Sequence, residues 1–204
     1  MIVYKLLKEI GKICKVANSN KFKNSNLSRN RALLAILIST GCPLKYLVLI
    51  KKKDLISIND YYRIEFKNDE TEKTIFIGFL NPKAKSILDE FLNSKENLDS
   101  DDFIFDLTIS AVEQFLVKVT FYAKIKMNVF GTNQNMKINQ RIQKRLFNIF
   151  EKNNISKQIV RYLKPSRESG YYGITMSKEK LELIFRNYQK VSKQVTGLKT
   201  GIAL

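Results

Sequence analysis

The sequence contains no histidine and only two cysteines, Cys14 and Cys42. The lack of histidine and the wide separation of the cysteines exclude a His/Cys metal cluster with the usual ligand spacing. Because the two cysteines fall in separate segments with helical spacing, we expect free thiols in a reducing compartment rather than a disulfide. The sequence therefore predicts a cytoplasmic protein without a thiol-bound or imidazole-bound metal.

Glycine-rich phosphate loops are also missing. The sequence has neither a G-x-x-x-x-G-K-[ST] loop nor a G-x-G-x-x-G turn, which are the patterns that cradle nucleotide phosphates. The acidic run Asp99–Asp102 has the composition of a two-metal site, but its polar surroundings indicate a solvated loop. We accordingly expect neither a cofactor nor a metal.

No apolar run approaches the roughly 20 residues that a membrane-spanning helix needs. The longest, around Ala32–Ser39, is far shorter. The N-terminal stretch MIVYKLLKEIGKICK alternates apolar and charged residues with helical spacing, which is not the pattern of a secretory signal. No lipidation signal is present either, so we expect no membrane partner.

Acidic residues are scarce, and the formal net charge is +17. The excess is uneven, since Lys137–Leu204 contains 15 Lys and Arg but only 4 Asp and Glu. Duplex DNA carries about one negative charge per 1.7 Å, and cations that neutralise its phosphates release bound counterions. Solubility or attraction to an anionic membrane surface would also explain a positive charge, but we favour double-stranded DNA as the partner.

The hydrophobic pattern predicts a mainly helical α+β domain with one small antiparallel sheet. Apolar residues at helical spacing predict the helices Val3–Val16, Asn30–Thr40, Leu44–Ile50, Asn81–Asn93, Ser110–Ile125, Ile138–Lys152, Lys157–Leu163 and Ser177–Lys190. Alternation predicts a hairpin of Tyr61–Phe66 and Thr74–Phe79 and a short strand Phe103–Phe105. We expect one domain over residues 1–190 and a flexible C-terminal arm over residues 191–204.

The segment Arg29–Leu55 carries the most specific pattern, RNRALLAILISTGCPLKYLVLIKKKDL. An apolar helix that begins R-x-R-A-L-L ends at T-G, and a turn, a second helix and the start of a strand follow. This order resembles the catalytic domain of tyrosine recombinases, the family of phage integrases and Xer-type proteins. The resemblance runs element by element to about residue 190 and implies a tyrosine recombinase catalytic-domain-like fold.

The resemblance also implies a chemistry. The family breaks a DNA phosphodiester by attack of a tyrosine, two arginines stabilise the phosphate oxygens, two histidines assist, and a hairpin lysine protonates the leaving oxygen. In this sequence Pro43 stands in the place of the first arginine, Lys67 matches the hairpin lysine, and Lys73 matches its neighbour across the turn. Because cations must be aimed at the phosphate before reaction, the missing arginine weighs against normal recombination.

The second group of family residues falls on the predicted helix Ile138–Lys152. Gln143 stands where the family has its second arginine, and Gln140 and Lys144 stand where it has histidines. A shifted register would offer Arg141 or Arg145 to the phosphate, but it would also turn apolar residues outward. The sequence therefore indicates a degenerate active site.

Two adjacent tyrosines, Tyr171 and Tyr172, match the nucleophile, since they precede a helix that begins SKEKL. The spacing differs from the family's by one residue, so both stay candidates. The cations that we expect to contact DNA are Lys45, Lys73, Arg141, Lys144, Arg145 and Arg167. Of these, Lys45, Lys144, Arg145 or Arg167 would take the place of the missing arginines.

Three hypotheses follow. The first is a DNA-binding protein from a mobile element or plasmid that keeps the recombinase-like fold without strand cleavage. The second is an atypical DNA strand transferase or relaxase that forms a phosphotyrosine intermediate through Tyr172 or Tyr171 with Lys67. The third is an interaction protein that keeps only the fold. In this hypothesis residues 191–204 would join copies into a homo-oligomer, because family members often exchange a C-terminal segment.

Overall fold

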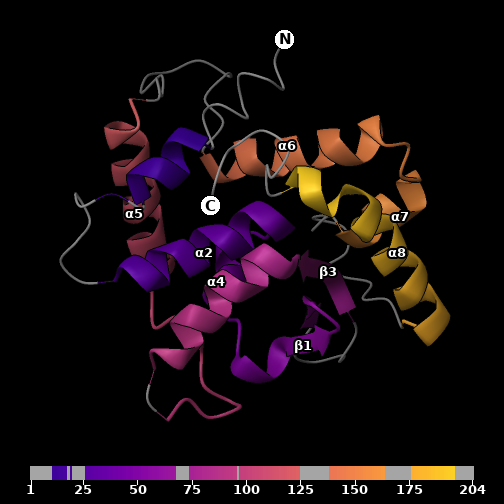
Figure 1. Ribbon diagram of the computed structural model, residues 1–204, viewed down its shortest axis with the longest axis horizontal. Coiled ribbons are helices and arrows are strands. Elements are labelled where there is room, and N and C mark those ends of the chain that lie inside the picture. Colours follow the sequence, from indigo (N-terminus) through magenta and orange to yellow (C-terminus); the bar gives the residue numbers. More distant parts are fainter. Residues whose placement is uncertain are drawn as a thin grey trace.

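A computed structural model of the protein describes residues 11–17, 19, 26–67, 74–95, 97–124, 138–163 and 176–195. Residues 11–17 are helical. The helices that follow are α2 (Leu27–Thr40), α3 (Leu44–Leu47), α4 (Pro82–Asn93), α5 (Ile109–Tyr122), α6 (Ile138–Lys152), α7 (Lys157–Leu163) and α8 (Lys178–Val195). The strands are β1 (Leu55–Ile58), β2 (Tyr61–Lys67) and β3 (Thr74–Leu80), and a short 3-10 turn, Lys52–Asp54, precedes β1. The chain thus has the expected mainly helical α+β fold with a small antiparallel sheet (Figure 1).

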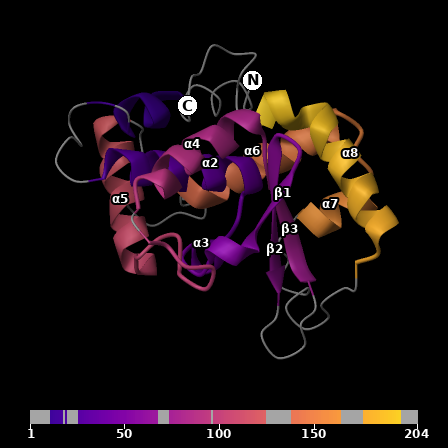
Figure 2. The same cartoon turned by 60° about the horizontal axis from the view of Figure 1, so that its bottom comes forward.

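The sheet has the strand order β1-β2-β3, with both pairs antiparallel. Ile64 lies opposite Gly78, and the ladder shifts register between Phe66 and Lys67 at the end of β2. The sheet stands between α2, α3 and α4 on one side and α7 and α8 on the other (Figure 2). Every residue of β3 is buried, because helices cover both of its faces.

Helix α2 forms the centre of the larger core. Ten of its fourteen residues are buried, as is typical of a helix that is apolar on all sides. The last residue of α2, Thr40, packs against Gly78 of β3. A Cβ added to Gly78 would lie 2.5 Å from Thr40 Cγ2. Glycine at position 78 therefore permits the close contact between α2 and the sheet.

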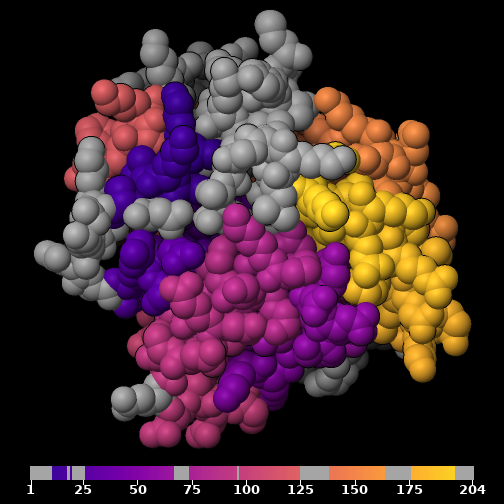
Figure 3. Space-filling model, viewed as in Figure 1, coloured from indigo at the N-terminus to yellow at the C-terminus, as the bar shows by residue number. Residues whose placement is uncertain are grey.

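Helix α8 extends further than the sequence predicted. It continues to Val195, and Val191 and Val195 are fully buried, because they continue the apolar stripe of Ile184 and Tyr188. Asn81 Nδ2 donates a 3.1 Å hydrogen bond to the carbonyl oxygen of Ser192. The predicted start of a flexible arm at residue 191 is therefore wrong for residues 191–195, and residues 196–204 lie outside the described residues. In Figure 3, α8 (yellow) forms the surface beside α4 and the strands.

The helix boundaries match the prediction or differ from it by a few residues. Helices α6 and α7 have the predicted bounds. Helix α2 begins at Leu27 instead of Asn30, and α3 ends at Leu47 instead of Ile50. Strand β1 was not predicted beyond its first residue, because its four residues do not alternate between buried and exposed. Phe103 forms only an isolated bridge, to Lys51.

Candidate nucleic-acid interface

The turn after α2 is held rigidly in place. Gly41 adopts a left-handed conformation with φ 63° and its N–H bonds to the carbonyl oxygen of Leu37, a C-terminal cap that favours glycine. Thr40 Oγ1 donates to the carbonyl oxygen of Ile36 at 2.8 Å and accepts the N–H of Cys42 at 3.1 Å. The turn therefore fixes the direction in which the chain leaves toward Pro43 and α3.

Helix α6 packs against this turn through Gln143. Its Nε2 donates a 2.7 Å hydrogen bond to the carbonyl oxygen of Gly41. An added Cβ on Gly41 would lie 3.2 Å from Leu146 Cδ2 and 3.4 Å from Gln143 Cγ. The structure thus places Gln143 beside the turn that carries Pro43, so the positions that the sequence matched to the family's two arginines lie on neighbouring elements. Proline has no side-chain donor, and the amide of Gln143 is used within the fold.

Helix α3 connects the same region to the end of the hairpin. The ring of Tyr46 lies 5.7 Å from that of Phe66 and 5.5 Å from that of Phe76, centroid to centroid. Lys45 is exposed, and its Nζ lies 4.5 Å from the centroid of the Tyr46 ring. Because Lys67 directly follows Phe66 in β2, this aromatic cluster brings the backbone of Lys67 close to α3. The aromatic cluster was not predicted from the sequence.

The basic residues of α6 point in different directions. Lys144 is exposed, and Arg141 is half-buried with contacts inside the chain. Arg145 is buried, and its guanidinium donates to the carbonyl oxygens of Val195 at 2.7 Å and Gln194 at 2.9 Å. Burial lowers the pKa of Arg145 to about 10. A guanidinium inside the fold does not reach a phosphate, so the prediction of Arg145 as a DNA contact is wrong.

The sequence contained a signal for this burial. Arg145 lies three residues after Ile142 and four before Ile149, both of which are buried. It therefore occupies the apolar face of α6, where an arginine needs an internal acceptor. The C-terminal carbonyl groups of a helix are such acceptors, and the helix dipole favours a cation there.

Four predicted site residues lie outside the described residues: Tyr171, Tyr172, Lys73 and Arg167. Lys67 is described only by its backbone, as the last residue of β2 opposite Thr74. The residues that the structure does bring together are the Gly41–Pro43 turn, Lys45 on α3, the end of β2, and Gln143 with Lys144 on α6.

The acidic run Asp99–Asp102 is an exposed loop, as its composition indicated. Lys53 pairs with Asp101, and the backbone N–H of Asp99 bonds to a carboxylate oxygen of Asp102. The pairing with Lys53 lowers the pKa of Asp101. Within the described part of the chain no group of three or more His, Cys, Asp or Glu could hold a metal ion, and no helix there is long and apolar enough to cross a membrane.

The domain has a tyrosine recombinase catalytic-domain-like fold, as its similarity to solved structures of Xer recombinases shows. Neither a protein-family model nor a curated protein sequence matches the chain.

Solved structures of Xer recombinases share this fold. The XerA recombinase is 12% identical over 89% of this chain, with a TM-score of 0.58. XerH, a site-specific recombinase bound to its difH substrate before cleavage, is 19% identical over 86% of this chain, with a TM-score of 0.59. XerH after cleavage of a palindromic difH substrate is 19% identical over 95%, with a TM-score of 0.56. The chain covers 63% of the XerA chain and 51% of each XerH chain.

Proposed function

We propose that this protein binds double-stranded DNA through the surface formed by the Gly41–Pro43 turn, α3, the end of the hairpin and α6, and that it does so without cleaving the strand. Lys45 and Lys144, both exposed, would contact the phosphates together with the half-buried Arg141, and Lys73 and Arg167 would extend the set. An origin in a mobile element or plasmid belongs to the same proposal.

One observation carries the non-cleaving part of this proposal. The amide of Gln143 donates to the carbonyl oxygen of Gly41, so its donor points at the fold instead of at a bound phosphate. Pro43, two residues further along, has no donor to offer. Removing one donor that stabilises a transition-state oxyanion typically costs about 10²–10³ in rate, and here two such donors are absent from the matched positions.

The binding part is supported by charge and by the fold. The chain carries a formal charge of +17, and Lys45 and Lys144 are exposed on the two helices that flank the turn. XerH, which shares the fold, is bound to a DNA substrate in its solved structures. Phosphate contacts fix a protein on the duplex without reading its sequence. The charge and the fold therefore support duplex DNA as the partner but do not identify a target sequence.

Binding is tested by fluorescence anisotropy with labelled duplex DNA at several salt concentrations. We expect affinity to fall steeply with salt, and each of Lys45→Ala and Lys144→Ala to reduce the salt slope by about one. Lys152→Ala is the matched control, because this lysine is also exposed but lies at the far end of α6. Salt-independent or undetectable binding would contradict the proposal.

The alternative is an atypical strand transferase or relaxase that forms a covalent bond between DNA and Tyr172 or Tyr171. The contact between Tyr46 and Phe66 favours it, because Lys67 follows Phe66 in β2 and its backbone therefore lies near α3. Incubation with labelled fragments of the protein's own replicon, denaturation in SDS and electrophoresis would detect an adduct. An adduct that disappears in Tyr172→Phe or Tyr171→Phe would show that the protein is an enzyme and would contradict the proposal of binding without cleavage.

A further inference from the structure

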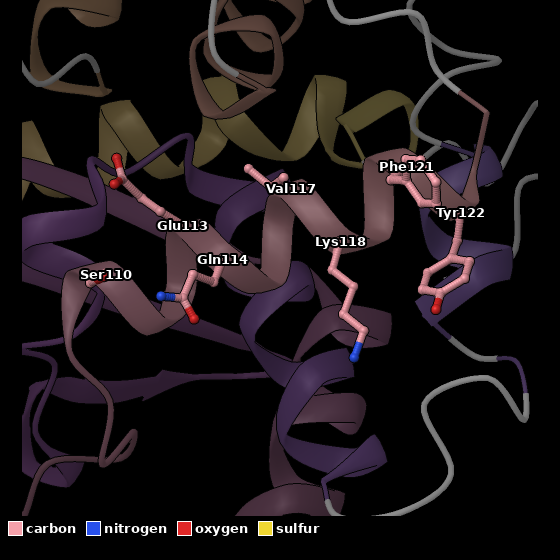
Figure 4. Close-up of a pocket in the computed structure, with 7 residues that line it drawn as sticks. All are labelled: Ser110, Glu113, Gln114, Val117, Lys118, Phe121 and Tyr122. Atoms are coloured by element: carbon pink, nitrogen blue, oxygen red, sulfur yellow. The ribbon is translucent and has the colours of Figure 1, made fainter. Parts of the chain in front are cut away.

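This strongly basic protein carries an exposed acidic loop between α4 and α5. Three of the four residues Asp99–Asp102 are acidic, and all four are exposed. Helix α5, which follows, has no such excess of one sign. The groove along it is lined by Glu113 and Lys118, one charge of each sign, and otherwise by uncharged side chains (Figure 4). Residues 98–103, which we call the acidic loop, are therefore a local region of negative charge on a protein with a formal charge of +17.

The acidic loop packs on three successive lysines, residues 51–53, which we call the lysine segment. Lys51 forms an isolated antiparallel bridge with Phe103, and its Nζ lies 5.5 Å from the centroid of the Phe103 ring. The backbone N–H of Lys52 donates to the carbonyl oxygen of Asp102 at 3.1 Å, and its Nζ donates to that of Leu98 at 2.7 Å. The contacts thus involve both the backbone and the side chains of these lysines.

Lys53 is held in the same way. Its backbone N–H donates to the carbonyl oxygen of Ser100 at 2.9 Å, and its Nζ pairs with the carboxylate of Asp101. Both side chains of the pair are accessible, 52% for Lys53 and 69% for Asp101. Because the two charges are exposed side by side, an anion that reaches Lys53 also meets the carboxylate of Asp101.

The lysine segment lies at the margin of the proposed DNA-binding surface. It connects α3, on which Lys45 is exposed, to β1. Strand β1 is antiparallel to β2, with Leu55 opposite Ile64. The turn Lys52–Asp54 therefore lies toward the end of β2, and it contacts that strand. The three lysines are thus next to two parts of the surface, α3 and the end of the hairpin.

The charges around the lysine segment do not favour a phosphate. The three ammonium groups lie beside four carboxylates, those of Asp54, Asp99, Asp101 and Asp102. Asp54 accepts the N–H of Lys51 at 2.8 Å. Proteins bind the DNA backbone with cations that neutralise its phosphates, and here carboxylates already outnumber the cations. A single exposed ion pair contributes little, so it is this excess of carboxylates that repels DNA.

We propose that the acidic loop keeps DNA away from the lysine segment and so sets the edge of the DNA-binding surface beside α3. This inference rests on the proposed function and adds the boundary of its surface. Lys45 contacts a phosphate, whereas Lys53 makes no phosphate contact in the wild-type protein. Removing the charge of Asp101 abolishes the ion pair and reduces the repulsion, so the DNA contact then extends onto Lys53.

The test compares the salt dependence of duplex binding, measured by fluorescence anisotropy, for the wild type, Lys53→Ala, Asp101→Asn and the double variant. Lys53→Ala should leave the salt slope of the wild type unchanged. Asp101→Asn should increase the slope by about one and tighten binding on the order of fivefold at about 0.1 M salt. The double variant should return to the wild-type slope, because the additional contact belongs to Lys53.

Asp60→Asn is the matched control. Asp60 is also exposed, but it lies in the turn between β1 and β2, at the other end of these strands from the lysine segment. The control changes the net charge as Asp101→Asn does and should leave the slope unchanged. Circular dichroism checks that every variant is folded.

Two results would overturn the inference alone. One is a loss of about one from the slope when Lys53→Ala is made in the wild type, because Lys53 would then already contact DNA. The other is an equal effect of Asp101→Asn and Asp60→Asn on the slope. A wild-type protein that binds no duplex DNA would instead overturn the proposed function, and this inference with it.

Discussion

The Nε2 atom of Gln143 lies 2.7 Å from the carbonyl oxygen of Gly41, although 102 residues separate them in the sequence. The hydrogen bond joins the C-terminal end of α2 to the middle of α6. It is accompanied by close packing, since Gly41 has no room for a Cβ without pressing on Leu146. This hydrogen bond therefore connects two segments of the proposed DNA-binding surface, the Gly41–Pro43 turn and α6.

Gln143→Leu should lower the free energy of unfolding by about 1–3 kcal/mol, because it leaves the buried carbonyl group of Gly41 without this donor. Urea denaturation measures the change. Gln189→Leu is the control, because Gln189 is exposed on α8 and its replacement should shift stability by less than about 0.5 kcal/mol. Equal stability of the two variants would show that the bond contributes nothing.

Gly78→Ala should destabilise the protein by about 1–3 kcal/mol, because the new methyl group would overlap Thr40 Cγ2. Thr40→Ser removes that methyl group and keeps the hydroxyl group that bonds Ile36 and Cys42. The double variant should therefore be more stable than the sum of the two single changes predicts. Additive effects in a double-mutant cycle, measured by thermal unfolding, would rule out the proposed overlap as the cause.

Arg145→Ala should cost about 2–4 kcal/mol, because it creates a cavity and removes the donors from two carbonyl groups of α8. Arg145→Met should cost less, since methionine refills the volume and removes a buried charge. Both variants, where folded, should bind DNA as the wild type does. A stable Arg145→Ala variant with reduced DNA affinity would show that Arg145 does contribute to DNA binding.

The buried thiols of Cys14 and Cys42 predict a loss of stability at high pH. Burial raises the pKa of each from 9.0 to about 12. Because the unfolded chain releases these protons first, the stabilising contribution is complete below about pH 9 and declines above it, by at most about 1.4 kcal/mol per pH unit for each thiol.

Urea midpoints at about pH 8 and about pH 10 measure this decline. The variant with both cysteines replaced by alanine should lose less stability between the two pH values than the wild type, whatever its starting stability. Lysine and tyrosine titrations are common to both proteins and cancel in the comparison. Equal losses would mean that the thiols titrate normally in the folded protein.

Local patterns in the sequence were enough for most of the elements. The bounds of α6 and α7 follow from helical periodicity and from the Ser156 cap, whose Oγ accepts the N–H of Ile159 at 3.3 Å. The end of α8 was misplaced because the small and polar residues around Val195 outweighed the apolar spacing of Val191 and Val195. Strand β1 was missed beyond Leu55 because pairing with β2, and not alternation, defines it.

The candidate site was also predictable from the sequence only in part. The sequence pointed to the turn at Gly41–Pro43, to Lys67 and to Gln143 as separate positions in a family-like order. The sequence did not predict the hydrogen bond from Gln143 to Gly41, the aromatic cluster around Tyr46 or the acceptors of Arg145. Each of these contacts joins residues from different elements, and no periodicity within one element encodes them.

The sequence by itself determined the helices, the hairpin, the strong positive charge and the class of fold, because these depend on residue types at short spacing and on composition. The spacing on α6 placed Arg145 on the apolar face, but only the tertiary structure supplied the acceptors that hold its guanidinium inside the fold and away from a phosphate. Lys144 and Arg145 are neighbours on α6, yet one is exposed and the other is buried against the end of α8. A rotation of about 100° between adjacent helical residues, and the packing of one distant helix, make that difference.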